Sequence, residues 1–345
     1  MTTTGSAPVT AERRTLVLTT GLAVLLVVLA AVAFLSVALG SRDISLAEVL
    51  RALSDMSTSS TGGTVTVEMR VPRTLLGILA GAALGASGAV LQGVTRNPLA
   101  DPGIMGINAG ASAFVVLAIT VFGLRGISTY IWFAFLGAVV AILLVYAVGS
   151  LGREGATPVK LALAGAAVTA GLVSLTSGIV MTNVDALNEL RFWQVGSLAG
   201  RYAPILLGVA PFLLLGIVVA LACGRPLNGL ALGDDTARAL GMNVNRTRIA
   251  MFAIVAVLCG AATAACGPIV FIGLVVPHVA RLLCGPDYRW ILPYSVLLSP
   301  IVLLLADVLG RILGSPGELQ VGVVLGILGA PCFVALVRYG RMAEL

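Results

Sequence analysis

Apolar runs long enough to cross a lipid bilayer recur along the whole sequence. About 20 residues of helix span a hydrocarbon core of roughly 30 Å. We expect ten such spans, at 15–39, 72–95, 104–122, 129–149, 160–181, 204–222, 248–266, 272–284, 291–310 and 320–339. With 59% hydrophobic and 10% charged residues, the chain carries more apolar side chain than one water-soluble core can bury. The sequence therefore predicts an all-α polytopic membrane protein of about ten transmembrane helices.

Positive charge in the loops indicates the orientation of the chain. If the N-terminus lies inside, 13 Lys and Arg residues fall on the cytoplasmic side and 8 on the outer side. Since Lys and Arg accumulate on the cytoplasmic side, we expect both termini inside, and a membrane surface rather than nucleic acid as the partner of this charge. The expected parts are a cytoplasmic tail at 1–14, one transmembrane domain at 15–340 and a long cytoplasmic loop at 227–248.

Several chemistries are excluded by what the sequence lacks. Its one lysine, Lys160, does not follow the glycine frame of a phosphate-binding loop, so the chain is not expected to hydrolyse ATP. Its one histidine, His278, excludes an HExxH zinc site, and the five cysteines show no CxxC spacing. We therefore expect no catalytic residues, no metal site and no cofactor bound by this chain.

The second span and the loop after it carry the clearest local patterns. Gly77, Gly81 and Gly85 form a GxxxGxxxG ladder, which lets another helix approach closely and predicts a central helix. Gln92 lies near the inner end of this span, where it either faces a water-filled path or hydrogen-bonds between helices. The polar stretch 96–106, RNPLADPGIMG, contains two prolines that stop a helix, so we expect a short cytoplasmic reversal. The eighth run, 272–284, contains a proline and is expected to be a broken helix buried in protein.

Two long motifs resemble the signatures of the FecCD family, the membrane subunits of binding-protein-dependent ABC importers for iron-siderophores, haem and cobalamin. They are RVPRTLLGILAGAALGASGAVLQGVTRNPLADPGIMGINAGAS at 70–112 and GPIVFIGLVVPHVARLLCG at 267–285. Three shorter motifs are similar to the ferric enterobactin permeases of that family: LTSGI at 175–179, LRFWQVGSL at 190–198 and PGELQVGVV at 316–324. In the last motif Gln320 stands where many family members have proline. The resemblance implies the BtuC-like fold of type II ABC importers over residues 15–340.

The resemblance implies roles for three outer arginines. Arg70, Arg73 and Arg311 match positions at which such importers receive acidic residues of the two lobes of the substrate-binding protein, and a guanidinium fork suits carboxylates. The alternative is that these arginines only snorkel toward the membrane interface. Two acids lie close in sequence: Asp307, one turn before Arg311, is placed to pair with it, and Glu318 either orients Arg311 or pairs within the outer loop.

The cytoplasmic loop 227–248 carries helix signals of its own. Asp234 and Asp235 stand at an expected N-terminus, Arg238 near the other end, and Gly241 at a left-handed position after it. The apolar side would comprise Leu232, Ala237, Leu240 and Met242. The resemblance implies the coupling helix that docks on a cytoplasmic ATPase; the alternative is a helix lying on the membrane surface.

Two further segments are assigned by comparison with the family or by residue type. The stretch 152–160 matches the place where the family narrows its pathway at the cytoplasmic end, which implies that Pro158 and Val159 form a gate. Trp193 follows the fifth span on the outer side, where tryptophan commonly anchors a helix at the membrane interface. We therefore favour an anchor over a contact with cargo.

Together these features predict a transport subunit rather than an enzyme. The resemblance implies a multi-pass permease of the cytoplasmic (inner) membrane that imports a ferric siderophore, of the catecholate type. The implied partners are two cytoplasmic ATPase subunits that use ATP and Mg, an extracytoplasmic siderophore-binding protein and a second, related permease chain, with a homodimer as the alternative. Import of cobalamin or haem is a second possibility for the cargo. An ion-coupled secondary transporter is less supported, because the acids cluster in loops and at span ends.

Overall fold

The structure is a computed structural model that describes residues 11–56, 58–151 and 157–339. All regular structure within these residues is helical. The ten expected spans correspond to α1 (Ala11–Ala38), α4 (Val71–Thr95), α5 (Ile107–Phe122), α6 (Ile127–Gly149), α7 (Pro158–Thr182), α9 (Ala203–Ala222), α12 (Val244–Cys266), α13 (Ile272–Cys284), α14 (Tyr288–Leu313) and α15 (Val321–Tyr339). By length and composition, seven helical stretches are long and apolar enough to span a membrane, and α5, α13 and α15 are shorter apolar helices. The prediction of an all-α membrane protein with about ten spans is confirmed.

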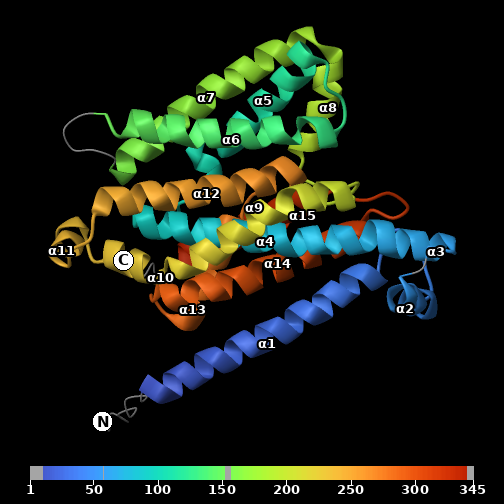
Figure 1. Cartoon of the computed structure of the whole chain (residues 1–345), viewed down its shortest axis with the longest axis horizontal. Coiled ribbons are helices and arrows are strands. Elements are labelled where there is room, and N and C mark those ends of the chain that lie inside the picture. The colour runs from blue at the N-terminus through green and yellow to red at the C-terminus, as the bar shows by residue number, and fades with distance from the viewer. Residues whose placement is uncertain (1–10, 57, 152–156, 340–345) are drawn as a thin grey trace.

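Short elements cap the two ends of this bundle (Figure 1). At one end, which we call the outer end, lie α2 (Leu46–Asp55), α3 (Thr61–Thr64) and the π-helical turn η1 (Val65–Arg70), which leads directly into α4. At the opposite, inner end lie α10 (Gly224–Ala231), α11 (Asp234–Ala239) and the first turns of α1. The remaining elements are the turn η2 (Pro102–Met105) and α8 (Val184–Gln194). The orientation with both termini inside stays a prediction.

Two expectations need adjustment. Residues 1–10 of the expected tail lie outside the described residues, and residues 11–14 already belong to α1. The span 272–284 is one short helix and is not broken, although Pro277 lies within it. The irregular backbone comes before that helix, at 267–271, where Phe271 has a φ of 68°. Pro277 has no N–H to donate to the carbonyl oxygen of Gly273, and the Gln92 side chain donates to that oxygen at 3.4 Å.

Helix α4 lies in the middle of the bundle (Figure 1), packed against α14, α12, α13 and α9. Its glycines are the reason that the neighbours come so close. A Cβ atom on Gly81 would lie 2.6 Å from the Pro300 Cα of α14, and one on Gly88 would lie 1.9 Å from the Gly273 carbonyl oxygen of α13. Contacts this short have no room for a side chain, so the glycine ladder predicts the central helix correctly.

Replacing a glycine of this contact tests the packing. We expect Gly81→Val to lower the melting temperature of the detergent-solubilised protein strongly, because the α14 backbone must move, and overpacking costs about 1–3 kcal/mol or more. The matched control is Gly178→Val on α7, where no atom lies within 4 Å of the added Cβ, so both variants carry the same change in helix propensity. Equal melting temperatures for the two variants would contradict this account of α4.

Candidate functional site

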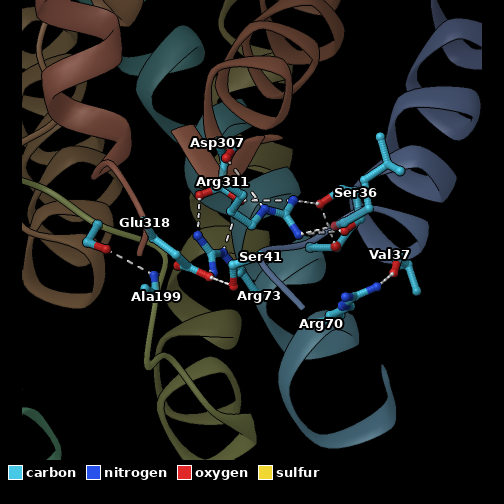
Figure 2. Close-up of polar contacts among 12 residues, drawn as sticks. Ser36, Val37, Ser41, Arg70, Arg73, Ala199, Asp307, Arg311 and Glu318 are labelled. Atoms are coloured by element: carbon cyan, nitrogen blue, oxygen red, sulfur yellow. Dashed lines mark hydrogen bonds and ion pairs between the residues drawn. The ribbon is translucent and has the colours of Figure 1, made fainter. Parts of the chain in front are cut away.

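Two arginines and two carboxylates meet at the outer end of the bundle, and a third arginine lies beside them (Figure 2). We call this set the outer arginine cluster: Arg73, Arg311, Asp307 and Glu318, with Arg70 beside them. Asp307 is only 1% exposed and accepts two hydrogen bonds from Arg73, at 3.0 and 2.8 Å. Arg311 Nη2 lies 3.2 Å from the same carboxylate, so the expected pairing of Asp307 with Arg311 is confirmed. Asp307 is therefore shared between two guanidinium groups.

Glu318 pairs with Arg73, whose Nη1 donates to its Oε2 at 2.8 Å, and it also accepts a hydrogen bond from Ser41. Glu318 makes no direct contact with Arg311, so the expectation that it orients Arg311 is wrong. Instead it pairs with Arg73 at the outer end of the bundle. Burial raises the pKa of Glu318, but the facing Arg73 guanidinium and the other groups around the carboxylate lower it by more. The pKa of Glu318 therefore lies below its usual value. The carboxylate is therefore charged at neutral pH.

Arg70 and Arg311 also hold the end of α1. Arg70 donates to the carbonyl oxygens of Val37 and Ala38 at 3.0 and 2.7 Å, and Arg311 Nη1 donates to that of Ser36 at 2.8 Å. The last carbonyl groups of a helix lack partners within it, and cations are favourable there. Since both side chains are buried among protein groups, the snorkelling alternative is wrong for them.

A pocket of about 320 Å³ opens beside the outer arginine cluster. Five arginines line it, together with one acid: Arg42, Arg70, Arg73, Arg201, Arg311 and Glu318. Such a pocket attracts a carboxylate from outside, and the planar guanidinium groups offer paired donors to it. Two of these arginines, Arg42 and Arg201, were not among the residues assigned from the sequence.

At the inner end, Asp234 joins three helices. It is the first residue of α11, and its carboxylate contacts Arg96 at the end of α4 and Arg248 of α12, the latter at 2.9 Å. Burial alone would raise the pKa of Asp234, but Arg248 and Arg96 lower it more, and the pKa lies below its usual value. Asp234 and Asp235 form the first turn of α11, so the expected helix N-terminus is confirmed, although Gly233 is the N-cap and no side chain caps this helix.

The apolar side chains of the expected coupling helix differ in their exposure. Ala237 is buried against the bundle, whereas Leu232 and Leu240 are 62% and 65% exposed. Asp235 is fully exposed and pairs with Arg238 at 3.1 Å. Gly241 has a φ of 81°, as expected for a left-handed residue after a helix. The segment therefore exposes two leucine side chains at the inner end of the bundle.

Comparison with known proteins identifies the family. Residues 26–339 match the FecCD transport family. The chain belongs to this family. One relative is the ferric enterobactin transport system permease protein FepD of Escherichia coli (strain K12), 47% identical over 92% of this chain and 94% of that protein. Another is the Fe(3+)-citrate import system permease protein YfmD of Bacillus subtilis (strain 168), 42% identical over 89% of this chain and 91% of that protein.

The fold of this FecCD permease is also that of a solved transporter. An inward-facing conformation of a metal-chelate type ABC transporter superposes with a TM-score of 0.81, at 28% identity, covering 92% of this chain and 98% of that one. The chain is thus a multi-pass transport subunit of the cytoplasmic membrane, with the fold of the ABC importer permeases.

The structure of this FecCD permease places Gln92 inside a contact between helices. Its side chain is fully buried and donates to the carbonyl oxygens of Gly273 and Leu274 at 3.4 and 3.1 Å. On the other side, Arg281 donates to Gln92 and to the hydroxyl of Tyr288, at 3.5 and 3.0 Å. Of the two roles expected from the sequence, the bond between helices is the one seen here, and a gate role for Gln92 stays a prediction.

Pro158 and Val159 form the first turn of α7, and both are exposed in this single chain. The preceding residues 152–156, part of the expected constriction, lie outside the described residues. In the most apolar 18-residue stretch of α7, only 17% of the residues are buried within this chain, the same share as in α1. The gate role of Pro158 and Val159 stays a prediction, and their exposure leaves them accessible to another subunit.

A second cavity, of about 660 Å³, lies between α5, α7 and α8. Its lining combines apolar residues with hydroxyl, amide and guanidinium groups, namely Asn108, Ser112, Thr169, Thr176, Arg191 and Gln194. Trp193 is not among them: it is 2% exposed and packs in the core, so the membrane-anchor interpretation is wrong. Trp193 lies near the end of the short helix α8, and its side chain is part of the hydrophobic core.

Proposed function

We propose that this chain is a membrane-spanning subunit of an ABC importer that carries a ferric siderophore of the catecholate type into the cytoplasm. The observation that carries the proposal is the 47% identity to the ferric enterobactin permease across 92% of the chain. The 42% identity to a ferric citrate permease supports iron chelates as the cargo class. In this proposal the binding protein selects the cargo, and the permease supplies the passage.

At the inner end, the segment 227–248 docks on a cytoplasmic ATPase, of which two copies use ATP and Mg. The support is the exposure of Leu232 and Leu240, which need an apolar partner, on a segment that Asp234 fixes to α4 and α12. Movement of the ATPase would then reach the centre of the bundle through these ion pairs. Coupling requires that the two transporter states differ in affinity for the ATPase.

At the outer end, an extracytoplasmic siderophore-binding protein docks over the outer arginine cluster. The support is the pocket lined by five arginines, which attracts acidic side chains. Arg70, Arg73 and Arg311 have their guanidinium groups engaged within this chain, so their part in docking is to hold the pocket in shape and supply its charge.

A second permease subunit covers α7 and completes the pathway. The exposed face of α7 and the adjoining cavity of about 660 Å³ support this part of the proposal. The resemblance to the enterobactin-type permeases implies two related but different permease chains, so we propose a heterodimer, with a homodimer as the alternative.

An ion-coupled transporter fits the structure less well. Such transporters keep an ionisable group within the membrane that gains and loses a proton or ion. The best candidate, Asp307, is held by Arg73 and Arg311 at hydrogen-bond distance. Both oxygens of this carboxylate are already bound by guanidinium groups, so a transported ion could reach them only by breaking these pairs.

The test is iron uptake by cells that lack this gene and other ferric-siderophore permeases. We expect a plasmid copy to restore uptake of radiolabelled iron from a catecholate siderophore, and not from a hydroxamate siderophore. Uptake of haem and of cobalamin, measured in parallel, should not depend on the plasmid. Restoration of only haem or cobalamin uptake would assign that cargo instead, and restoration of none would overturn the proposal.

A further inference from the structure

The cavity of about 660 Å³ between α5, α7 and α8 has one kind of charge in its wall. Among the described residues that line it, Arg191 of α8 is the only charged one. Much of the remaining lining is apolar, with Val173 and Val180 of α7 and Leu187 of α8. A charge beside apolar groups is screened less than one in open water. Arg191 therefore gives this cavity a positive potential.

The guanidinium group of Arg191 is not engaged by an acid of this chain. Its central carbon lies 5.1 Å from the centre of the Phe192 ring, and no carboxylate among the described residues forms an ion pair with it. The acids of α8, Asp185 and Glu189, do not line the cavity, and Asp185 pairs with Arg125. The place of Arg191 in the last turn of α8 suits a cation, but leaves its N–H donors unused. These donors are available to a ligand.

Uncharged hydrogen-bonding groups from three helices share the cavity with Arg191. Asn108 lies on α5, Thr169 and Ser177 on α7, and Gln194 on α8. The hydroxyl of Thr169 is buried and has no hydrogen-bond partner within the described part of the chain. A buried polar group without a partner is costly, unless water or a ligand pairs with it. The cavity thus offers hydrogen bonds and one positive charge to whatever enters it.

The charge of the cargo gives this arrangement a use. A ferric complex of three catecholate groups is an anion, because three doubly charged ligands outweigh one ferric ion. A ferric complex of three hydroxamate groups is neutral, because three singly charged ligands balance the ion. An anion that leaves water for a largely apolar passage loses hydration, and a fixed cation in the wall offsets part of that cost. A neutral complex gains nothing comparable from the cation.

We propose that Arg191 binds the negatively charged ferric catecholate complex as it enters the cavity, and so makes the passage favour anionic over neutral cargo. The inference rests on the proposed function and adds a specificity-determining residue to it. A guanidinium group suits this ligand, because it donates to oxygen anions and also stacks on aromatic rings. In this arrangement the passage adds a preference for charge to the selection made by the binding protein.

The first experiment measures the potential of the cavity in the complete transporter, reconstituted in nanodiscs. Ser177 is exposed and lines the cavity, so Ser177→Cys provides a reactive thiol there, and Cys332→Ser removes the exposed native cysteine. The probes are an anionic and a cationic methanethiosulfonate reagent of similar size. We expect Arg191→Gln to lower the ratio of anionic to cationic reaction rates about threefold or more, and Arg191→Lys to preserve the ratio.

The matched control is Arg51→Gln, which removes an exposed outer arginine on α2, across the bundle from α8 (Figure 1). It changes the net charge of the chain equally and should leave the ratio unchanged. An equal fall in both variants, or no fall in Arg191→Gln, would overturn the inference. So would a cysteine at position 177 that neither reagent reaches, because cargo would then not enter this cavity.

The second experiment measures transport by the complete transporter in proteoliposomes, with binding protein loaded with a radiolabelled ferric catecholate siderophore. We expect Arg191→Gln to lower kcat for iron uptake about tenfold and Arg191→Lys to keep most of it, with the Kd of the binding protein unchanged in both. A loss of binding-protein affinity that accounts for the lost uptake would overturn the inference, because Arg191 would then act in docking. Unchanged uptake by Arg191→Gln would also overturn it. If the wild type transports no ferric catecholate, the proposed function is wrong, whatever the potential of the cavity.

Discussion

Asp307→Asn is expected to destabilise the folded permease by about 3–5 kcal/mol, because it leaves the buried Arg311 guanidinium without a carboxylate and Arg73 with Glu318 alone. Arg73 and Arg311 converge on this carboxylate, and Asp307 and Arg311 are 1% and 2% exposed. Asparagine keeps the shape and one acceptor oxygen, so the loss reports the charge rather than a cavity. The measurement is the melting temperature and the yield of monodisperse protein in detergent.

Glu318→Gln is the matched control for this prediction. It removes the other carboxylate of the outer arginine cluster, but Glu318 is 28% exposed and pairs with Arg73 alone. Partly exposed pairs contribute about 1 kcal/mol or less. Equal destabilisation by the two variants would contradict the account, in which Asp307 stabilises the outer arginine cluster more than Glu318 does.

Truncation of the two exposed leucines at the inner end is the second large expected effect. Leu232→Ala combined with Leu240→Ala should weaken ATPase binding roughly a hundredfold, since burial of two leucines at an interface is worth about 3 kcal/mol or more. Folding should be unaffected, because both side chains are exposed in the isolated chain. The measurement is titration of the purified ATPase onto the permease in detergent.

The control carries the same two changes at the opposite end of the bundle. Leu46 and Leu50 of α2 are also exposed, so Leu46→Ala with Leu50→Ala matches the loss of apolar area. Unchanged ATPase affinity in the inner variant, or an equal loss in the outer one, would contradict docking through the segment 227–248.

The sequence predicts the spans well and their connections poorly. Ten apolar runs became ten helices because bilayer thickness and backbone hydrogen bonding leave few other solutions for such runs. The polar stretch 39–70 has no comparable constraint, and α2, α3 and the π-helical turn before α4 were not expected. Their positions depend on tertiary contacts, such as those of Arg70 with the end of α1.

The candidate sites show a similar division. Spacing along one helix predicted the pair of Asp307 and Arg311, which lie one turn apart. Nothing in the sequence places Arg73 opposite the same carboxylate, because the two residues are 234 positions apart. Asp234 and Asp235 look equivalent in the sequence, yet one bridges α4 to α12 and the other is fully exposed. Local signals identify charged residues, but the fold decides which of them are paired.

Transport by the reconstituted complex tests the central claim most directly. The permease, its partner permease and the ATPase are placed in proteoliposomes with ATP inside, the side on which the ATPase segment 227–248 is expected. Binding protein loaded with radiolabelled ferric catecholate siderophore is added outside. We predict accumulation of iron in the vesicles that requires ATP, binding protein and this chain together. Accumulation without ATP, or none when all components are present, would contradict the account.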